Sequence, residues 1–326
     1  MYQSKVKKLV VSVVIHVEET ICAVIDVRGN VLARDSFATP DYPDAVQFVM
    51  ALRDCILALV EHNGGYDLVR SVGISTPSGH FTSGSIVNAP NMAWKGVVPL
   101  AAMLQDQLGL AVAVANNAYV TALAEHAFGV ARGMRDFVVV TIGSGLGSCI
   151  FANGKAVNGA AGFAGEVGHT CVVPGGRLCG CGNKGCLEMY TAGKGIVITA
   201  REVMQESDKP SLMRGVEALS AAQIADFCEA GDELAIETYR RAGEMLGKSL
   251  ANYMVLLDPE AFIFSGKVIR AGKWLLDPCQ ATFERHVLRQ SQTAVKFLVS
   301  EFDQGELELL GASVLAWDVK EYSLFK

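Results

Sequence analysis

One histidine and three cysteines are spaced closely enough in the sequence to bind a metal ion together. His169 precedes Cys179, Cys181 and Cys186 within the segment G-H-T-C-V-V-P-G-G-R-L-C-G-C-G-N-K-G-C-L-E at 168–188. A neutral imidazole and three thiolates form a four-ligand set suited to tetrahedral Zn²⁺. Because protein side chains would then fill all four positions, we expect a structural zinc loop. The alternative is a loop of free thiols.

A second candidate site consists of two adjacent amides, Asn116 and Asn117. They follow the apolar run A-V-A-V-A at 111–115, and a helical pattern begins directly after them. A strand end that opens a helix is a common place for ligands in α/β proteins. Amides orient a ligand through hydrogen bonds but cannot take up a proton. The pair is therefore suited to binding, and whether it also transforms its ligand stays open at this point.

Hydrophobic periodicity predicts alternating strands and helices around these residues. In the first half, strands are expected at 9–15, 21–26 and 31–37, then a helix at 44–62, a strand at 68–75, a polar loop, a helix at 99–108, a strand at 111–115 and a helix at 118–130. In the second half, we expect strands at 137–142 and 147–151, a long insertion at 158–195, helices at 196–206, 220–229 and 232–257, a strand at 261–265, a helix near 272–289, a strand at 294–300 and a helix at 305–319. Both halves open with a β-meander, which predicts two similar α/β lobes with a cleft between them.

Composition and charge indicate which partners the protein is expected to lack and in which cellular compartment it is expected to lie. Of the 326 residues, 51% are hydrophobic, and the formal net charge is −6 without a long basic run, so we expect no nucleic-acid partner. The apolar stretches are too short or too interrupted to span a bilayer, so we expect no membrane partner. His16, Glu18 and Glu19 interrupt the basic-then-apolar start of the chain, which favours a buried strand over a signal peptide. We therefore expect a cytoplasmic protein. Its five scattered cysteines are expected to be buried hydrophobes, namely Cys22, Cys55, Cys149, Cys228 and Cys279.

The pattern E-x-G-H followed by C-x-C-G-x-x-G-C-x-E, from Glu166 to Glu188, resembles the signature of the ROK family of repressors, open reading frames and sugar kinases. The resemblance covers nearly the whole chain. It implies the two-lobed actin-like ATPase fold with ribonuclease-H-like lobes, one formed by 1–117 plus 305–326 and the other by 118–304 with the zinc loop. It also implies a homodimer. Because the first predicted strand begins near residue 9, we expect no helix-turn-helix and hence no repressor.

Members of this family phosphorylate hexoses or N-acetylhexosamines with ATP, so the resemblance implies a sugar site. Its residues would be Asn91 in N-A-P-N-M-A-W, Asn116, Asn117, Glu166, His169 and Glu188. Sugar hydroxyls both donate and accept, so short polar side chains and carboxylates suit them. The zinc loop would fix the direction of Glu188, and the two nitrogens of His169 allow both metal and sugar contacts. The alternatives are solvated loop carboxylates for Glu166 and Glu188 and a turn role for Asn91.

The family's phosphate loops are only partly retained. The segment T-I-G-S-G-L-G at 141–147 resembles the second phosphate loop. The implied nucleotide-binding residues are Thr141, Gly143, Ser144, Gly145 and, in a later loop, Gly266. In place of the family pattern D-x-G-G-T-K, the chain has V-I-H-V-E-E at 14–19, which removes the glycines and brings carboxylates toward a polyanion. Lys267 is either a phosphate ligand or a surface lysine.

Asn117 occupies the position of the family's catalytic Asp, which takes the proton from the attacking sugar hydroxyl. General-base catalysis contributes about 10²–10⁴-fold, and an amide cannot supply it. No carboxylate nearby in the sequence clearly takes over. The predicted function is therefore hexose or N-acetylhexosamine binding in the interlobe cleft, with phosphotransfer weak or lost. The alternative is an active glucokinase-like hexose kinase that uses ATP and Mg²⁺, so whether the chain is an enzyme stays open.

Overall fold

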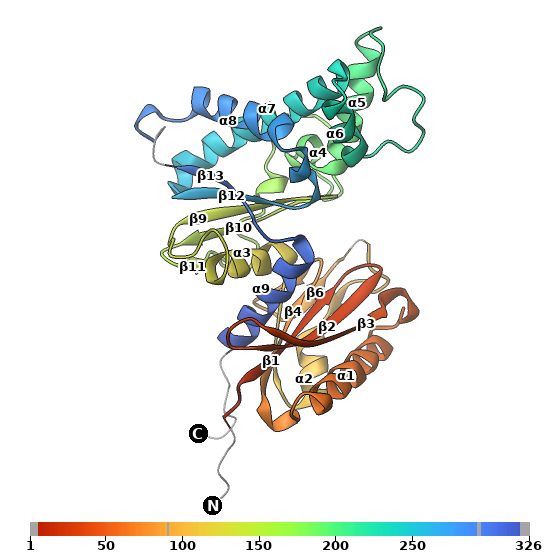
Figure 1. The fold of residues 1–326 in the computed structure, drawn as a ribbon, viewed down its shortest axis with the longest axis vertical. Helices are drawn as coiled ribbons and strands as arrows, with labels where there is room; N and C mark the ends of the chain where they lie inside the picture. Colours follow the sequence, from red (N-terminus) through yellow and green to blue (C-terminus); the bar gives the residue numbers. More distant parts are fainter. Residues whose placement is uncertain (1–5, 90, 292–294, 320–326) are drawn as a thin grey trace, which may run out of the picture. The chain divides into compact units, whose positions relative to one another are not determined.

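The computed structural model describes residues 6–89, 91–291 and 295–319. Pro90 of the N-A-P-N motif and residues 320–326 of the predicted first lobe lie outside this part. The chain divides into two compact units (Figure 1): unit 1 comprises 1–129, 158–163 and 305–326, and unit 2 comprises 130–157 and 164–304. Among the described residues, no helix combines the length and the apolar character needed to cross a membrane.

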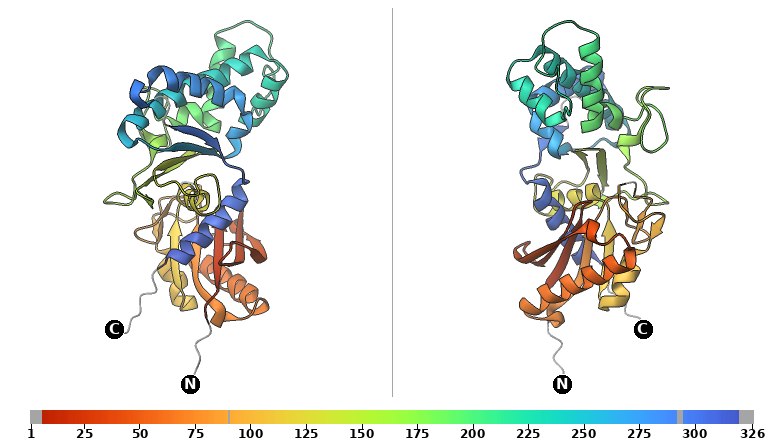
Figure 2. Two further views of the ribbon diagram at one scale, coloured as in Figure 1. Left: turned by 60° about the vertical axis from the view of Figure 1, so that its left-hand side comes forward. Right: turned by 90° about the vertical axis from the view of Figure 1, so that its right-hand side faces the viewer.

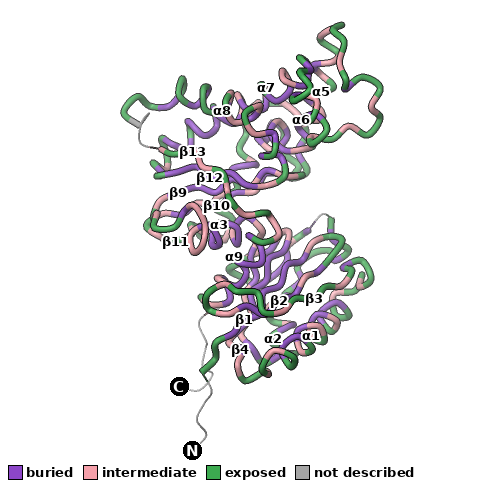
Figure 3. The backbone as a smooth tube through the Cα atoms, in the orientation of Figure 1, coloured by how far each residue is buried: buried purple, intermediate pink, exposed green. Residues whose placement is uncertain are grey.

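Unit 1 is built on a five-stranded sheet with the strand order β3-β2-β1-β4-β8. The strands are β1 (Leu9–Ile15), β2 (Glu19–Asp26), β3 (Val31–Ala38), β4 (Val69–Ser75) and β8 (Ala111–Ala115). The first three pair antiparallel as the predicted meander, β4 runs parallel to β1, and β8 runs parallel to β4. All of β1 is buried, whereas β3 lies at the edge and is mostly exposed (Figure 3). Full burial explains why β1 is an almost unbroken apolar run.

Helices bury both faces of this sheet. Helices α1 (Ala45–His62) and α2 (Leu100–Leu108) contribute one core, in which apolar side chains of α1 at helical spacing, such as Phe48 and Leu52, join Val11 and Val13 of β1. Helix α9 (Gln304–Asp318) runs along the other face of the sheet (Figure 2). Its Leu309 joins Val10 and Val14 of β1 in a second core. The sheet therefore needs the last helix of the chain to complete its second core.

The backbone of α9 lies close to both β1 and helix α3 (Asn117–Ala127). Ser12 donates a hydrogen bond from Oγ to the carbonyl oxygen of Leu309, at 2.7 Å. A Cβ atom on Gly311 would lie 1.8 Å from the carbonyl oxygen of Val120, so only glycine permits this approach. These contacts fix α9 against the first turns of α3.

The predicted polar loop between β4 and α2 contains a small sheet that the sequence did not reveal. Strands β5 (Gly79–His80), β6 (Ser85–Val87) and β7 (Val97–Val98) pair antiparallel. Strands of two or three residues are too short to show an alternating pattern. Segment 158–163 lies against them, because His80 Nε2 is 2.7 Å from the carbonyl oxygen of Ala161.

Unit 2 repeats the strand order of unit 1, as β11-β10-β9-β12-β13. The strands are β9 (Phe137–Ile142), β10 (Leu146–Ala152), β11 (Lys155–Ala156), β12 (Ala261–Ser265) and β13 (Lys296–Val299). The helices are α4 (Glu188–Thr191), α5 (Gly193–Gln205), α6 (Ala221–Glu229), α7 (Glu233–Leu257) and α8 (Lys273–His286). Again an antiparallel meander is followed by two parallel strands. The shared order confirms the predicted α/β fold built from two similar halves.

Candidate functional site

The two amides lie where β8 ends and α3 begins. Asn116 is the N-cap of α3, and its Oδ1 accepts a hydrogen bond from the backbone nitrogen of Tyr119 at 2.8 Å. Asn caps helices well because this contact satisfies an otherwise unpaired donor. The cap uses the carbonyl oxygen of the side chain and leaves Nδ2 for a ligand.

Asn117 contacts a carboxylate that the sequence reading missed. Its Nδ2 donates to Glu308 Oε2 at 3.0 Å, and His16 Nε2 lies 3.4 Å from the same oxygen. The Glu308 side chain is only 1% exposed, while that of His16 is 39% exposed. The available signal was a glutamate within the apolar run L-E-L-L-G-A at 307–312 of the last helix. Its partner could not be inferred, since 191 residues separate it from Asn117.

The expected first phosphate loop is a tight hairpin turn in the structure. The backbone nitrogen of His16 donates to the carbonyl oxygen of Glu19 at 2.8 Å, which leaves only Val17 and Glu18 in the turn. Val14 is buried beneath α9, whereas Glu18 in the turn and Glu19 directly after it are exposed. The amide of His16 is therefore already paired and does not face a phosphate.

The N-A-P-N loop carries Asn91 on the surface of unit 1. Asn91 is exposed, whereas Met92 and Trp94, which follow it closely in the sequence, are buried. Trp94 Nε1 donates to the carbonyl oxygen of Tyr42 at 3.1 Å. The neighbouring apolar residues anchor the loop, so that Asn91 stays available to a ligand.

In unit 2 the structure brings the four predicted metal ligands together. One ligand atom each from His169, Cys179, Cys181 and Cys186 lies within 4.8 Å of all the others. Cys179 Sγ is 3.6 Å from His169 Nδ1, and Cys181 Sγ is 3.6 Å from Cys186 Sγ. Tetrahedral coordination with usual zinc bond lengths requires edges of about 3.5 Å between S and N and about 3.8 Å between two sulfurs. Both the donor set and the spacing fit a tetrahedral metal ion.

Arg177 attaches this cysteine loop to α5. Its guanidinium donates to the carbonyl oxygens of Met189 (2.6 Å) and Gly195 (3.0 Å) and to Thr199 Oγ1 (2.9 Å), pairs with Glu202, and lies 4.5 Å from the centre of the Tyr190 ring. The planar fork of arginine suits several fixed acceptors at once.

We expect Arg177→Lys to lower the free energy of unfolding by about 2–3 kcal/mol, because an ammonium group cannot reach all these acceptors. Urea unfolding followed by circular dichroism measures the change. Arg201→Lys makes the same exchange at an exposed position of α5 and should stay within about 0.5 kcal/mol of the parent. Equal stability of the two variants would show that the hydrogen bonds of the Arg177 guanidinium are not needed to keep the cysteine loop in place.

Glu188 links the cysteine loop to the glycine-rich turn. Its Oε2 accepts from the backbone nitrogen of Leu146 at 2.9 Å, and its Oε1 lies 3.8 Å from Cys179 Sγ. A Cβ atom on Gly145 would lie 2.6 Å from Glu188 Oε2, so glycine leaves the space for this carboxylate. A carboxylate predicted for sugar binding is thus held between the predicted phosphate turn and the predicted metal loop.

Glu166 is the N-cap and His169 the last residue of a short 3₁₀ helix, Val167–His169. Although the Glu166 residue is exposed, partial burial of its carboxyl group raises its pKa. The imidazole of His169 opposes this rise in the pKa, and the like charge of Glu188 adds to it. The three predicted sugar ligands of unit 2 therefore lie close enough to influence one another.

The glycine-rich turn joins β9 to β10. The carbonyl oxygen of Gly143 in this turn accepts a hydrogen bond from the backbone nitrogen of Gly193, the first residue of α5, at 2.8 Å, and Ser144 is exposed. The Thr141 hydroxyl shares a 2.9 Å hydrogen bond with the hydroxyl of Ser265. Gly266 follows β12 directly. Of the two predicted phosphate-binding hydroxyls, that of Ser144 is therefore the more accessible. Lys267, beside Gly266, is also exposed.

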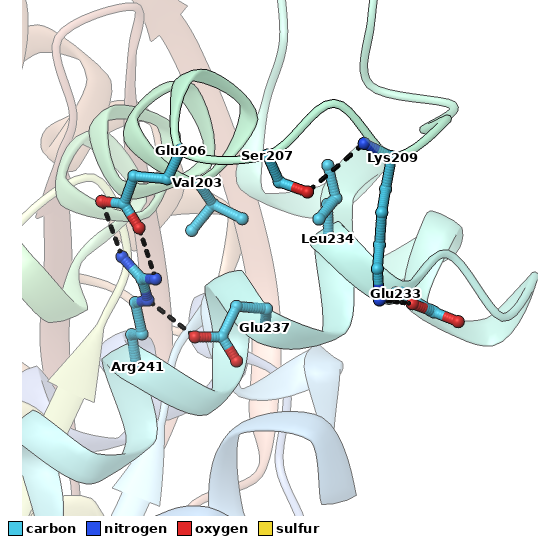
Figure 4. A pocket seen from close by; sticks show the side chains of 8 residues that line it. All are labelled: Val203, Glu206, Ser207, Lys209, Glu233, Leu234, Glu237 and Arg241. Carbon is cyan, nitrogen blue, oxygen red and sulfur yellow. Dashed lines mark hydrogen bonds and ion pairs between the residues drawn. The ribbon is translucent and has the colours of Figure 1, made fainter.

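A separate cavity of about 410 Å³ lies between α5 and α7 of unit 2 (Figure 4). Its lining consists of Val203, Glu206, Ser207, Lys209, Glu233, Leu234, Glu237 and Arg241. Arg241 pairs with Glu206 at 2.6 Å and with Glu237 at 2.7 Å, and Lys209 pairs with Glu233 at 2.5 Å. Because these charged groups largely neutralise one another and no predicted site residue lines the cavity, we assign it no ligand.

Comparisons with known proteins match nearly the whole chain. A model of the ROK family matches residues 10–319. A glucokinase from Streptomyces coelicolor is 31% identical over 302 residues, which cover 90% of this chain and 92% of the relative. An N-acetylmannosamine kinase from Citrobacter koseri is 28% identical over 269 residues, covering 82% of this chain and 85% of the relative.

Solved structures agree with these relatives. The crystal structure of a ROK family glucokinase from Streptomyces griseus, in complex with glucose and AMPPNP, matches with a TM-score of 0.75 at 30% identity, covering 95% of this chain and 100% of that chain. The match confirms the predicted actin-like ATPase fold. By sequence and by structure, this chain belongs to the ROK family.

Proposed function

We propose that this chain binds a hexose or an N-acetylhexosamine, and that its phosphotransfer is weak or lost. Relatives named as glucokinase and N-acetylmannosamine kinase support the sugar class. Each unit supplies polar side chains that suit hydroxyl groups: Asn91, Asn116 and Asn117 in unit 1, and Glu166, His169 and Glu188 in unit 2. Carboxylates and amides together offer both the acceptors and the donors that a sugar requires.

The loss of phosphotransfer rests mainly on the side chain of Asn117. This amide occupies the position of the family's base, and an amide is not basic enough to take a proton from a sugar hydroxyl; its Nδ2 donates a hydrogen bond to Glu308 instead. The closed turn at His16 supports the same conclusion, because phosphoryl transfer depends on donors and metal ions placed around the phosphates. Glu18 and Glu19, exposed beside this turn, would repel a polyphosphate.

An active ATP-dependent hexose kinase is the second candidate function. The turn between β9 and β10 retains the glycines of a phosphate loop and exposes Ser144. A carboxylate, Glu308, also lies 3.0 Å from the amide of Asn117. These two observations favour some remaining turnover with ATP and Mg²⁺.

We propose Zn²⁺ as the metal for the cluster of His169, Cys179, Cys181 and Cys186. With four protein ligands it has no open position, so it would order the loop around Glu188 and would not activate a substrate. None of the nine cysteines forms a disulfide in the structure, a state that a reducing compartment maintains, and we propose a cytoplasmic location. The homodimer is proposed from the family resemblance.

Calorimetry with glucose, mannose, N-acetylglucosamine and N-acetylmannosamine tests the proposed function. We expect at least one sugar to bind with a Kd between about 1 μM and 1 mM, the range of typical KM values. In a coupled assay with ATP and Mg²⁺, sugar-dependent ADP release should be at least about 100-fold below the 1–100 s⁻¹ of ordinary kinases.

Two controls separate the candidate functions. A reaction without sugar measures background hydrolysis of ATP, and Glu188→Gln should weaken sugar binding because an amide replaces a carboxylate acceptor. Sugar-dependent ADP release at ordinary kinase rates would establish the second candidate. Absence of binding for all four sugars would overturn both.

A further inference from the structure

Glu308 joins the side chain at the catalytic position to the altered first turn. Its Oε2 accepts from Asn117 Nδ2 at 3.0 Å and lies 3.4 Å from His16 Nε2. Glu308 is buried at 1% exposure, while Asn117 is partly exposed. Within the described part of the chain, the hydrogen bond to Glu308 is the one that the Asn117 side chain makes. All three residues belong to unit 1.

The chemistry of the carboxylate determines how the amide is turned. An asparagine side chain has a donor end and an acceptor end of nearly equal size, so its own shape does not select an orientation. An ionised carboxylate only accepts hydrogen bonds. Asn117 must therefore direct Nδ2 toward Glu308, which leaves Oδ1 on the side away from it.

We infer that Glu308 is a positioning residue that holds the Asn117 amide so that Oδ1 accepts a hydrogen bond from one sugar hydroxyl. This inference rests on the proposed sugar binding and goes beyond it. Asn117 then keeps the acceptor role of the family's carboxylate without its charge or its basicity. Sugar affinity would then depend on whether the ring position facing Asn117 Oδ1 carries a hydroxyl that can donate a hydrogen bond.

Monofluoro sugars test this sensitivity, because fluorine cannot donate a hydrogen bond. The probes are glucose and its 2-, 3-, 4- and 6-monofluoro analogues, or those of whichever panel sugar binds most tightly. We expect the parent protein to bind the analogue fluorinated at one ring position about 3- to 10-fold more weakly than the sugar itself. Weaker binding of analogues fluorinated at further positions would indicate hydrogen bonds from those hydroxyls to other residues.

Glu308→Gln releases the orientation while keeping the size of the side chain. A glutamine can both donate and accept, so Asn117 can then present either end to the ligand. In this variant, the analogue fluorinated at the position that Asn117 contacts should bind within about twofold of the unmodified sugar. The affinity ratios for the other fluorinated positions should stay unchanged. Glu306→Gln makes the same exchange at an exposed position of α9 and should give the parent profile.

Asn117→Ala provides an independent arm. It removes the acceptor, so the deficit at the same ring position should vanish, and adding Glu308→Gln to it should change nothing further. If Glu308→Gln weakens all probes equally, or if Asn117→Ala keeps the parent profile, the inference is wrong while sugar binding stands. If the parent protein binds no sugar, the proposed function fails and the inference fails with it.

Discussion

Asn117→Asp, which places a carboxylate where the family resemblance implies one, is expected to destabilise the protein at neutral pH and not to restore full phosphotransfer. The new carboxyl group would lie about 3 Å from the buried carboxylate of Glu308, in place of the present 3.0 Å hydrogen bond. Two unit charges at that distance repel by about 5 kcal/mol at an effective dielectric constant of 20. The site accommodates one carboxylate and one amide. A second carboxylate at position 117, with Glu308 unchanged, therefore places two negative charges in contact.

The pH dependence of this variant has a defined sign. The pair can avoid repulsion by binding one proton, which costs about 1.4 kcal/mol for each pH unit above the ordinary carboxyl pKa of about 4.3. Folding then takes up a proton, so stability is lost as pH rises and recovered as it falls. We expect Asn117→Asp to lower the free energy of unfolding by about 4 kcal/mol at pH 7.5 and by about 1.5 kcal/mol at pH 5.5, measured by urea unfolding at both values.

The double variant Asn117→Asp with Glu308→Gln is the matched control. It keeps one acid and one amide but exchanges their places, so its stability should return to within about 1 kcal/mol of the parent. Its ADP release with sugar should exceed that of either single variant, because the carboxylate again occupies the position of the base. If Asn117→Asp alone proves fully stable and fully active, Glu308 does not constrain this position.

Cys186→Ser is expected to remove the metal and, with it, most sugar binding. Cys186 is fully buried, and Glu188 follows it by two residues at the start of α4. A structural zinc site contributes much of the folding free energy of its loop, about 10–16 kcal/mol in isolated zinc fingers at pH 7. Elemental analysis should show about one zinc per parent chain and none in the variant, and sugar affinity should fall at least about 100-fold.

Cys171→Ser provides the comparison for this experiment. Cys171 is exposed and lies in the same loop, but it is not a member of the four-ligand group found among the described residues. Its replacement should leave both zinc content and sugar affinity unchanged. Treating the parent protein with a strong chelator should remove the zinc and lower sugar affinity as Cys186→Ser does. Adding Zn²⁺ back should restore both. Full sugar affinity in metal-free protein would show that Arg177 and Leu146 alone position Glu188.

Much of the fold followed from local patterns in the sequence. Strands 9–15, 111–115, 137–142 and 261–265 have the predicted bounds because each is an apolar run closed by polar or glycine residues. The four predicted metal ligands came together as expected, since three of them lie within eight residues of one another. Short spacing in the sequence limits how far apart such side chains can move.

Contacts between distant segments could not be read in the same way. The hydrogen bond between Asn117 and Glu308 spans 191 residues and depends on how α9 packs against α3. The small sheet β5–β6–β7 was missed because its strands of two or three residues are too short to show a repeated alternation. The roles proposed for Asn91, Asn116 and Ser144 stay predictions, because they depend on ligands and not on the fold alone.

The position of α9 at the far end of the chain also constrains how the protein is synthesised. β1 emerges from the ribosome early, but Val10 and Val14 are covered by residues 304–318, which come after all of unit 2. At about 5–20 residues per second, the 175 residues between 129 and 304 delay that cover by roughly 10–35 s. The residues of unit 2 are synthesised before α9. Until α9 emerges, one apolar face of the first sheet stays uncovered and Asn117 lacks its carboxylate partner.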